Sequence, residues 1–181
     1  MRFLRSLFRS SNPTKGWKED RAVAVVIDLD RHRLSGFGIR DRLAGLSFLG
    51  PATADGSVLT FPSKGITVGF ANGLITWFAA YVAASPEEGI ERFCGVFQYR
   101  GRRIDLSEGT AERETVTIFG PPYRRDQDAE EVILFYEFGE HEWQIEMSLN
   151  DRLRGFVIAP PILADAKQRA AYGVTKPWPS T

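Results

Sequence analysis

The tripeptides Leu49-Gly50-Pro51 and Phe119-Gly120-Pro121 share the pattern of an apolar residue followed by Gly-Pro, which is typical of the end of a helix. Glycine can take the left-handed position that ends a helix, and proline cannot continue one. At the shift that superimposes the two tripeptides, Val26 aligns with Val96. Beyond them the shift grows by several residues, and the alternating apolar residues still align: Ile66, Val68 and Phe70 with Trp143, Ile145 and Met147. The pattern predicts a tandem repeat.

Each half of the sequence predicts the same order of elements. A strand with alternating apolar residues comes first, at 22–30 and at 91–100, followed by a short extended piece. A helix is expected next, because Ile39, Leu43 and Leu46 share one helical face in the first half. In the second half Thr110 is expected to cap a helix over 111–118.

Three antiparallel strands are expected after each helix. Their connections are short, and Asn72-Gly73 is a strong signal for a two-residue hairpin. The predicted strands are 57–61, 65–70, 74–82, 132–138, 142–149 and 152–158. The expected fold class is therefore α+β: two tandem copies of a strand–helix–three-strand antiparallel unit, with a helix packed on one face of each sheet.

The expected organisation has four parts. A flexible or amphipathic N-terminal segment spans 1–16, a first α+β repeat 17–84, a second repeat 85–161, and a C-terminal helix with an extended tail 162–181. The joint between the repeats is placed near Ser85-Pro86-Glu87-Glu88, a polar stretch with a turn signal.

The composition argues against several function classes. Lys and Arg number 23 and so do Asp and Glu, so no overall positive field attracts nucleic acid, and no nucleic-acid partner is expected. Cys94 is the one cysteine of the 181 residues, which excludes an internal disulfide and a thiolate zinc site. We expect no cofactor, no bound metal and a cytoplasmic location, in keeping with a reducing compartment.

The first ten residues leave one alternative location open. Arginines at positions 2, 5 and 9 interrupt the apolar residues, so no secretory signal is expected. As a helix, however, residues 1–10 would place apolar side chains on one face and arginines on the other. Such a segment could contact an anionic membrane surface, which gives the alternative of a peripheral membrane-associated protein.

The order of helix, Gly-Pro and strands is that of a known architecture. It is carried by Gly109-Thr110-Ala111-Glu112, then by Phe119-Gly120-Pro121 and Phe135-Tyr136. In this the chain resembles the tandem α/β repeat of β-lactamase inhibitor proteins and the related fold of small outer-membrane assembly lipoproteins. The resemblance implies a protein-binding module whose sheet face forms a concave contact surface. A lipobox cysteine, a signal peptide and a disulfide pair are missing, so export and lipidation do not follow from it.

The leading hypothesis is thus a non-enzymatic, inhibitor- or immunity-like module that binds another protein through the helix-free face of its sheet. Strand alternation directs polar side chains to that face, and the rest of the proposed contact is aromatic. The predicted partner-binding residues are Phe78, Gln98, Arg100, Gln144, Glu146, Arg152, Arg154 and Phe156.

A small hydrolase-like enzyme is the alternative from another class. Asp28 and Asp30 lie two apart on a predicted strand and share a face, as paired acid–base carboxylates do. His32 and His141 are the two histidines, and either would need a pocket to act. His141 lies between two glutamates, but adjacent strand residues point to opposite faces and converge poorly on a metal. No catalytic residue is assigned.

Overall fold

The computed structural model describes residues 12–162 and 166–171. The proposed membrane-contacting segment at 1–10 and most of the predicted C-terminal tail lie outside these residues. Strands take up 42% and helices 14%, so the fold is mostly β. Among the described helices, none is long and apolar enough to cross a membrane.

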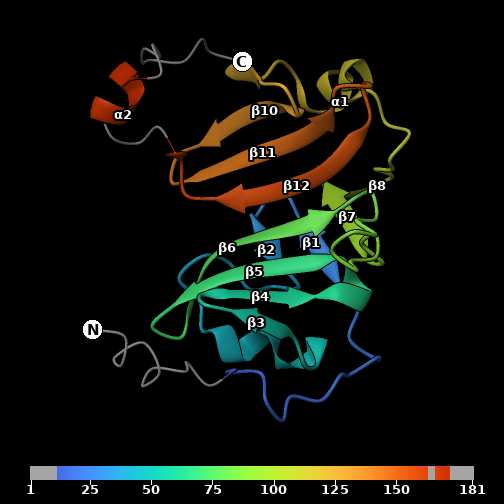
Figure 1. Ribbon diagram of the computed structural model, residues 1–181, viewed down its shortest axis with the longest axis vertical. Coiled ribbons are helices and arrows are strands. Elements are labelled where there is room, and N and C mark those ends of the chain that lie inside the picture. The colour runs from blue at the N-terminus through green and yellow to red at the C-terminus, as the bar shows by residue number, and fades with distance from the viewer. Residues whose placement is uncertain (1–11, 163–165, 172–181) are drawn as a thin grey trace, which may run out of the picture.

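Eight of the described strands form one sheet, here called the large sheet (Figure 1). Every neighbouring pair in it is antiparallel. Its order is β3 (Thr53–Asp55), β4 (Val58–Phe61), β5 (Ile66–Ala71), β6 (Leu74–Tyr81), β12 (Leu153–Ala159), β11 (His141–Ser148), β10 (Glu131–Phe138) and β9 (Arg124–Gln127).

The predicted hairpins and antiparallel strands are confirmed. Asn72 and Gly73 both have positive φ, 52° and 73°, as a type I′ turn requires. This turn joins β5 to β6, and β6 pairs in its second half with β12. The two chain segments therefore contribute to one continuous sheet.

Four further described strands form a second sheet, here called the small sheet. Its centre is a parallel pair of β1 (Val26–Asp28) and β7 (Val96–Tyr99), in which Val26 lies opposite Val96. The outer strands are β2 (Arg33–Leu34) and β8 (Arg102–Ile104). The predicted first strand of each half thus pairs with its counterpart in the other half.

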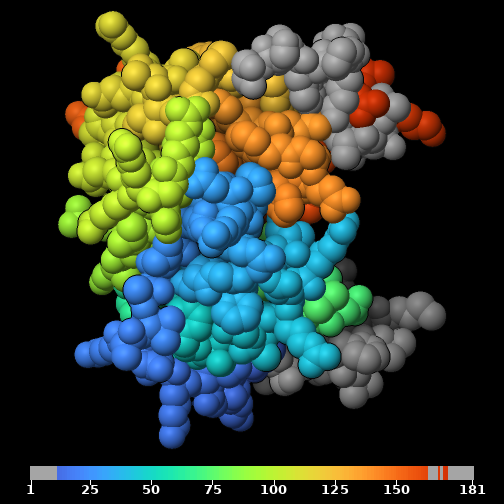
Figure 2. Space-filling model, turned by 180° about the vertical axis from the view of Figure 1, so that it is seen from behind, coloured from blue at the N-terminus to red at the C-terminus, as the bar shows by residue number. Residues whose placement is uncertain are grey.

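The core lies between the two sheets. We call the side of the large sheet that carries Ile66, Ile145 and Phe156 its back face, and these side chains are at most 1% exposed. The small sheet lies behind it in Figure 1, and Figure 2 shows the same side from behind, with blue segments of the first half beside the yellow-green β7 and β8. The opposite side of the large sheet, which faces the reader in Figure 1, is the front face.

The first predicted helix is a 3₁₀-helix, η1 (Leu43–Leu49). Its buried residues Leu43, Leu46 and Leu49 recur every third position, which matches the three residues per turn of a 3₁₀-helix rather than the α-helical period. A second short 3₁₀-helix, η2 (Pro62–Lys64), joins β4 to β5. The α-helices of the described residues are α1 (Glu112–Phe119) and α2 (Ala166–Ala171), the latter within the predicted C-terminal helix.

The predicted α+β fold of two tandem strand–helix–three-strand units is therefore wrong. The opening strands β1 and β7 leave the meanders that follow them and build a separate sheet, which together with η1 and α1 covers the back face. The strands β3 and β9, at the two edges of the large sheet, are not among the predicted strands. Both are largely polar, so they carry little of the apolar alternation by which strands are recognised.

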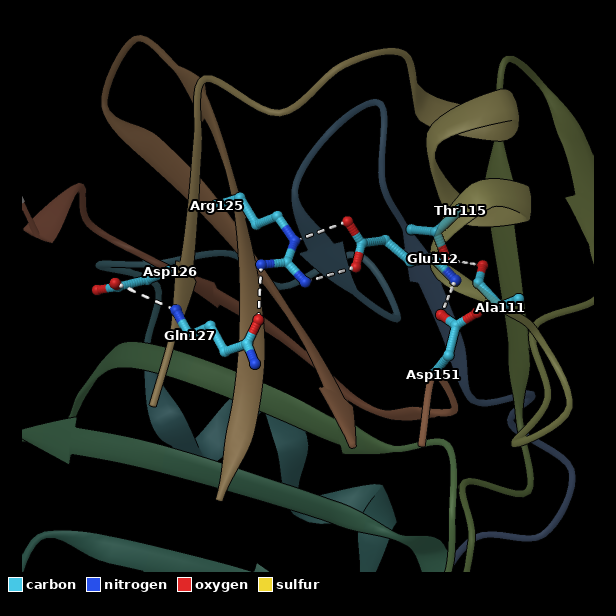
Figure 3. A network of polar contacts seen from close by, with 7 residues as sticks. All are labelled: Ala111, Glu112, Thr115, Arg125, Asp126, Gln127 and Asp151. Atoms are coloured by element: carbon cyan, nitrogen blue, oxygen red, sulfur yellow. Dashed lines mark hydrogen bonds and ion pairs between the residues drawn. The ribbon is translucent and has the colours of Figure 1, made fainter. Parts of the chain in front are cut away.

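The start of α1 is held from outside the helix (Figure 3). Asp151, in the turn between β11 and β12, accepts a 2.7 Å hydrogen bond from the backbone N–H of Glu112. The Glu112 carboxylate in turn accepts hydrogen bonds from Nε and Nη2 of Arg125 on β9, at 2.8 and 3.2 Å. Thr110, predicted to cap the helix, instead accepts a bond from the backbone N–H of Ser107. These contacts attach the start of α1 to β9 and to the turn between β11 and β12.

Candidate binding groove

A hollow of about 420 Å³ crosses the front face of the large sheet. It runs over four neighbouring strands, β5, β6, β12 and β11. The side chains that shape it are Thr67, Trp77, Ala79, Tyr81, Gln144, Glu146, Val157 and Ile162, with Gly155 at its base. We call this hollow the groove. Its volume falls within the roughly 300–1,000 Å³ typical of ligand pockets.

Small residues on the two central strands form the floor of the groove. Gly155 on β12 lies opposite Tyr81 on β6 and Glu146 on β11, and the next pair on the same face is Val157 with Ala79. One strand, β12, lies between the strands of Glu146 and Tyr81, so these two side chains start two strand spacings, about 10 Å, apart. The middle of the groove therefore carries small side chains, and longer side chains rise on both sides of it.

Two glycines allow large side chains to lie flat across the sheet. A Cβ on Gly69 would stand 2.0 Å from Nε1 of Trp77, so the indole occupies the space above this residue. A Cβ on Gly155 would stand 2.8 Å from Oε2 of Glu146, so the carboxylate leans over the floor toward β6. Both glycines thus shape the groove.

The carboxylate of Glu146 lacks a cation of its own. Burial raises its pKa, and the negative charges of Glu131 and Glu88 raise it further, while Arg154 lowers it. Arg154 forms its ion pair with Glu131, at 3.8 Å, and no described Lys, Arg or His comes within ion-pair distance of Glu146. This end of the groove therefore has an excess of negative charge.

Thr67 and Tyr81 lie on the opposite side of the groove, on β5 and β6. The Thr67 hydroxyl is buried and makes no hydrogen bond of acceptable geometry within the described residues, although the Tyr81 hydroxyl lies near. Burial raises the pKa of Tyr81, and the neighbouring Glu88 adds to the effect, so the phenol stays protonated at neutral pH. Leaving a buried hydroxyl unsatisfied costs about 1–3 kcal/mol, and the Tyr81 hydroxyl is the neighbouring group that can reduce this cost.

A second carboxylate on the same strand is fully satisfied. Glu142 is completely buried on the front-face side of β11 and accepts bonds from the Tyr123 hydroxyl and from Nε2 of Gln144, at 2.5 and 2.9 Å. The backbone N–H of Ile162 also donates to it. Glu142 therefore holds Gln144 in place at the edge of the groove.

The predicted partner-binding residues separate into groups. Gln144 and Glu146 line the groove, and Arg154 stands exposed at its Glu146 end. Gln98 belongs to the small sheet, where it lines a different hollow, and Arg100 lies in the β7–β8 turn with its guanidinium 5.1 Å from the Tyr99 ring. Gln98 and Arg100 do not lie at the groove.

Phe78 and Phe156 are not on the front face as expected. Each is 1% exposed, and Phe156 packs on the back face against Phe97, Phe119 and Trp143. Arg152 is exposed in the turn before β12, where its backbone N–H donates to Ser148. Neither phenylalanine can contact a partner without unfolding of the core.

Bulges explain the misplaced phenylalanines. On β6, Ile75 pairs with Phe70 and Trp77 pairs with Gly69, so Thr76 is an extra residue. On β12, Leu153 and Gly155 pair with adjacent residues of β11, so Arg154 is extra in the same way. An extra residue reverses the in–out phase of the strand. The three-residue spacing of apolar pairs, Ile75 to Phe78 and Leu153 to Phe156, was the signal that could have revealed Trp77 and Tyr81 as groove residues.

The two aspartates proposed for an enzyme accept separate structural hydrogen bonds, although both lie near enough to His32 to affect its pKa. Asp28 accepts the backbone N–H of Arg31 and lines the hollow shared with Gln98, whereas Asp30 accepts the backbone N–H of Gly101. The two histidines do meet, which sequence reasoning missed: their rings stack at 4.6 Å. Within residues 12–162 and 166–171, no cluster of three or more His, Cys, Asp or Glu side chains could hold a metal.

The structure thus has two facing sheets and a ligand-sized groove on the outer side of the larger one. No protein-family model matches the chain, and no curated protein matches it. Among solved structures, the chain is similar to YjgB from Bacillus subtilis, described as a DUF4309 family protein, at 14% identity and a TM-score of 0.40. The match covers 81% of this chain and 84% of that chain. A likeness this weak supports no conclusion, so the resemblance to β-lactamase inhibitor proteins stays a prediction.

Proposed function

We propose that this chain is a binding protein whose ligand, a segment of another protein, lies in the groove on the front face of the large sheet. The observation that carries the proposal is the combination of a low apolar floor with walls that hold polar groups. Val157, Ala79 and Gly155 form the floor. The buried Thr67 hydroxyl has the Tyr81 hydroxyl as its polar neighbour, and Glu146 has a carboxylate without an ion-pair partner among the described residues.

The energetics favour a bound state of this site. Apolar floor area removed from water stabilises a complex by about 25 cal/mol per Å². Trp77 is half-buried and held across Gly69, so it loses little conformational freedom when a partner packs on it. Rigid aromatic anchors of this kind are enriched among the residues that dominate protein interfaces.

Binding fits the geometry better than hydrolysis does. The groove contains a carboxylate and a phenol but no described histidine, cysteine or lysine that could serve as nucleophile or base beside them. Asp28 and Asp30 accept structural hydrogen bonds at separate places. An acid–base mechanism needs such groups within reach of one substrate atom.

Selection from a library of random displayed peptides against the full chain tests the proposal. Peptides enriched on the wild type should fail to bind the variant Ala79→Trp, because the indole fills the floor between Trp77 and Val157. The matched control is Ala22→Trp, which places the same side chain at an exposed position in the turn before β1. Thermal unfolding of both variants shows whether they remain folded.

The proposal expects enriched peptides to bind the Ala22→Trp protein as tightly as the wild type. If they bind Ala79→Trp equally well, the groove is not the binding site. A selection that enriches no peptide above the background of uncoated support would also overturn the proposal.

A further inference from the structure

We propose that the groove recognises a basic segment, with the ammonium group of a lysine side chain seated over Gly155 between Glu146 and Tyr81. The inference rests on the proposed binding function and specifies its ligand. It depends on charge, on the shape of the floor and on the aromatic wall.

The charge at this end of the groove favours a cation. The Glu146 carboxylate is affected by three charged neighbours: Glu131 and Glu88 are negative, and Arg154 is positive. With Glu146 itself, three carboxylates face one guanidinium, which already pairs with Glu131. Bringing an ammonium group beside Glu146 would remove the repulsion between these carboxylates and supply the missing ion pair. Because the Glu146 side chain is half-buried, such a pair is screened less than one on an open surface.

The shape of the floor provides the seat. Gly155 lies between Glu146 and Tyr81 in the same cross-strand row, and it has no side chain to fill the space. The Glu146 carboxylate leans over Gly155, which narrows the gap of about 10 Å between the Glu146 and Tyr81 side chains. One ammonium group fits there at charge-assisted hydrogen-bond distance from the carboxylate, roughly 2.7–2.9 Å.

Tyr81 and Glu88 form the opposite side of the seat. The Tyr81 ring offers a face to a cation, and attraction of this kind acts within about 6 Å of the ring centre. Its hydroxyl interacts with Glu88, so a second carboxylate stands close to the same space. Thr67 lies on the neighbouring strand with its buried hydroxyl near that of Tyr81.

The rest of the groove suits the remainder of a lysine-bearing segment. From the seat, Val157 and Ala79 continue the floor toward Trp77, with Gln144 on the β11 side. These side chains are apolar or neutral, and they can pack against the methylene groups of the lysine and against an adjoining apolar residue. A free inorganic cation would leave this surface unused, which is why the inference names a side chain.

Two capped peptides test the inference by calorimetric titration of the full chain. One has a lysine between two valines, and the other has norleucine in place of the lysine, so they differ only at the charged end. The lysine peptide should bind about tenfold more tightly to the wild type, since a cation paired with both a carboxylate and a ring gains about that factor. Glu146→Gln should reduce this preference to nearly none, and Tyr81→Leu should reduce it severalfold.

Two further variants separate recognition from structural damage. Arg154→Ala should strengthen binding of the lysine peptide severalfold, because it removes the competing positive charge; loss of structure would not increase affinity. Glu108→Gln, an exposed glutamate in the loop before α1 and outside the lining of the groove, should leave the preference unchanged.

The outcomes are distinguishable. If both peptides bind equally well and Ala79→Trp abolishes both, groove binding stands and the cation inference is overturned. If neither peptide binds while displayed peptides of other composition are enriched in a groove-dependent manner, the cation inference also fails alone. If no peptide of any kind depends on the groove, the proposed function fails with it.

Discussion

The indole Nε1 of Trp143 donates a 2.9 Å hydrogen bond to Nδ1 of His32, although 111 residues separate them in the chain. Trp143 lies on the back face of β11, and His32 lies in the turn between β1 and β2. The bond therefore joins the large sheet to the small one. Because Nδ1 accepts, the neutral imidazole carries its proton on Nε2. His141 stacks on the same ring, and Phe138 lies 4.2 Å from the Trp143 ring centre.

The burial of His32 against Trp143 and His141 makes the stability of the protein depend on pH, and His32→Asn should reduce that dependence. Burial lowers the pKa of His32 to about 4, and the positive charge of a protonated His141 lowers it too, against opposing effects of Asp28 and Asp30. Unfolded histidine titrates near 6.5. Between these values the unfolded chain binds a proton that the folded chain does not, so the free energy of unfolding falls as pH falls. From pH 7 to pH 5 we expect His32 to contribute about 1 kcal/mol of this loss, after allowing for partial exposure of the ring.

Asparagine is the suitable replacement at this position. His32 has φ of 54°, a conformation that asparagine tolerates, and the amide oxygen can still accept a bond from the indole. Urea unfolding at the two pH values measures the slope for each protein. The pKa of His141 is also lowered by burial, so part of the slope should remain. Equal slopes for wild type and variant would show that His32 does not titrate as described.

Much of the large sheet could be predicted from the sequence, because its strands carry strong alternation and clear turn signals. The alternating apolar residues Ile66, Val68 and Ile145, which the two halves share as a pattern, all lie on the back face and are fully buried. Asn72-Gly73 forms the hairpin turn that its residue types indicate. Here local propensity and tertiary environment agree, so local reasoning succeeds.

The parts that could not be predicted depend on contacts remote in sequence. The parallel pairing of Val26 with Val96 is invisible to any local pattern, although the two had been aligned as equivalents. The groove depends on two bulges that reverse strand phase. The bulge at Thr76 turns Trp77 and Tyr81 of β6 outward, and the bulge at Arg154 places Gly155 and Val157 of β12 on the same face. A single inserted residue has this effect because side chains alternate with a period of two.

Asp151 should stabilise α1 measurably, since it satisfies a backbone N–H in the first turn of a helix with only eight residues. Asp151→Ala should lower the free energy of unfolding by about 1–2 kcal/mol, the usual cost of losing an N-terminal cap. Asp151→Asn is the matched control: its side chain can still accept the bond and tolerates the φ of 59° found here. Urea unfolding compares the two, and an equal loss in both would show that the charge, rather than the hydrogen bond, is what matters.

Two tyrosines allow a charged and a neutral acceptor to be compared. Tyr123 donates to the buried carboxylate of Glu142, whereas Tyr136 donates to the backbone carbonyl of Gly120, at 2.9 Å. Tyr123→Phe should cost about 1.5–3 kcal/mol and Tyr136→Phe about 0.5–1.5 kcal/mol, because a bond to a charged group contributes more. If removal of the Tyr136 hydroxyl proved the more costly, the charge of Glu142 would not be what strengthens the Tyr123 bond. Burial raises the pKa of Glu142, and the bond from Tyr123 opposes that rise, so repeating the measurement at lower pH should narrow the difference.

Gly69 should be required because the Trp77 indole lies across it, and a double-mutant cycle can isolate that cause. In Gly69→Ala the new methyl group would stand 2.0 Å from Nε1 of Trp77, so the indole would have to move. We expect the free energy of unfolding to fall by about 1–3 kcal/mol from overpacking. In a Trp77→Leu background the same change should cost less, with a coupling of at least about 0.5 kcal/mol. Gly109→Ala, whose Cβ would stand 3.6 Å from its nearest neighbour, should change stability by no more than about 0.5 kcal/mol. Unfolding followed by circular dichroism avoids dependence on the removed tryptophan. Additive costs would mean that Gly69 matters for the backbone of β5 and not for the wall of the groove.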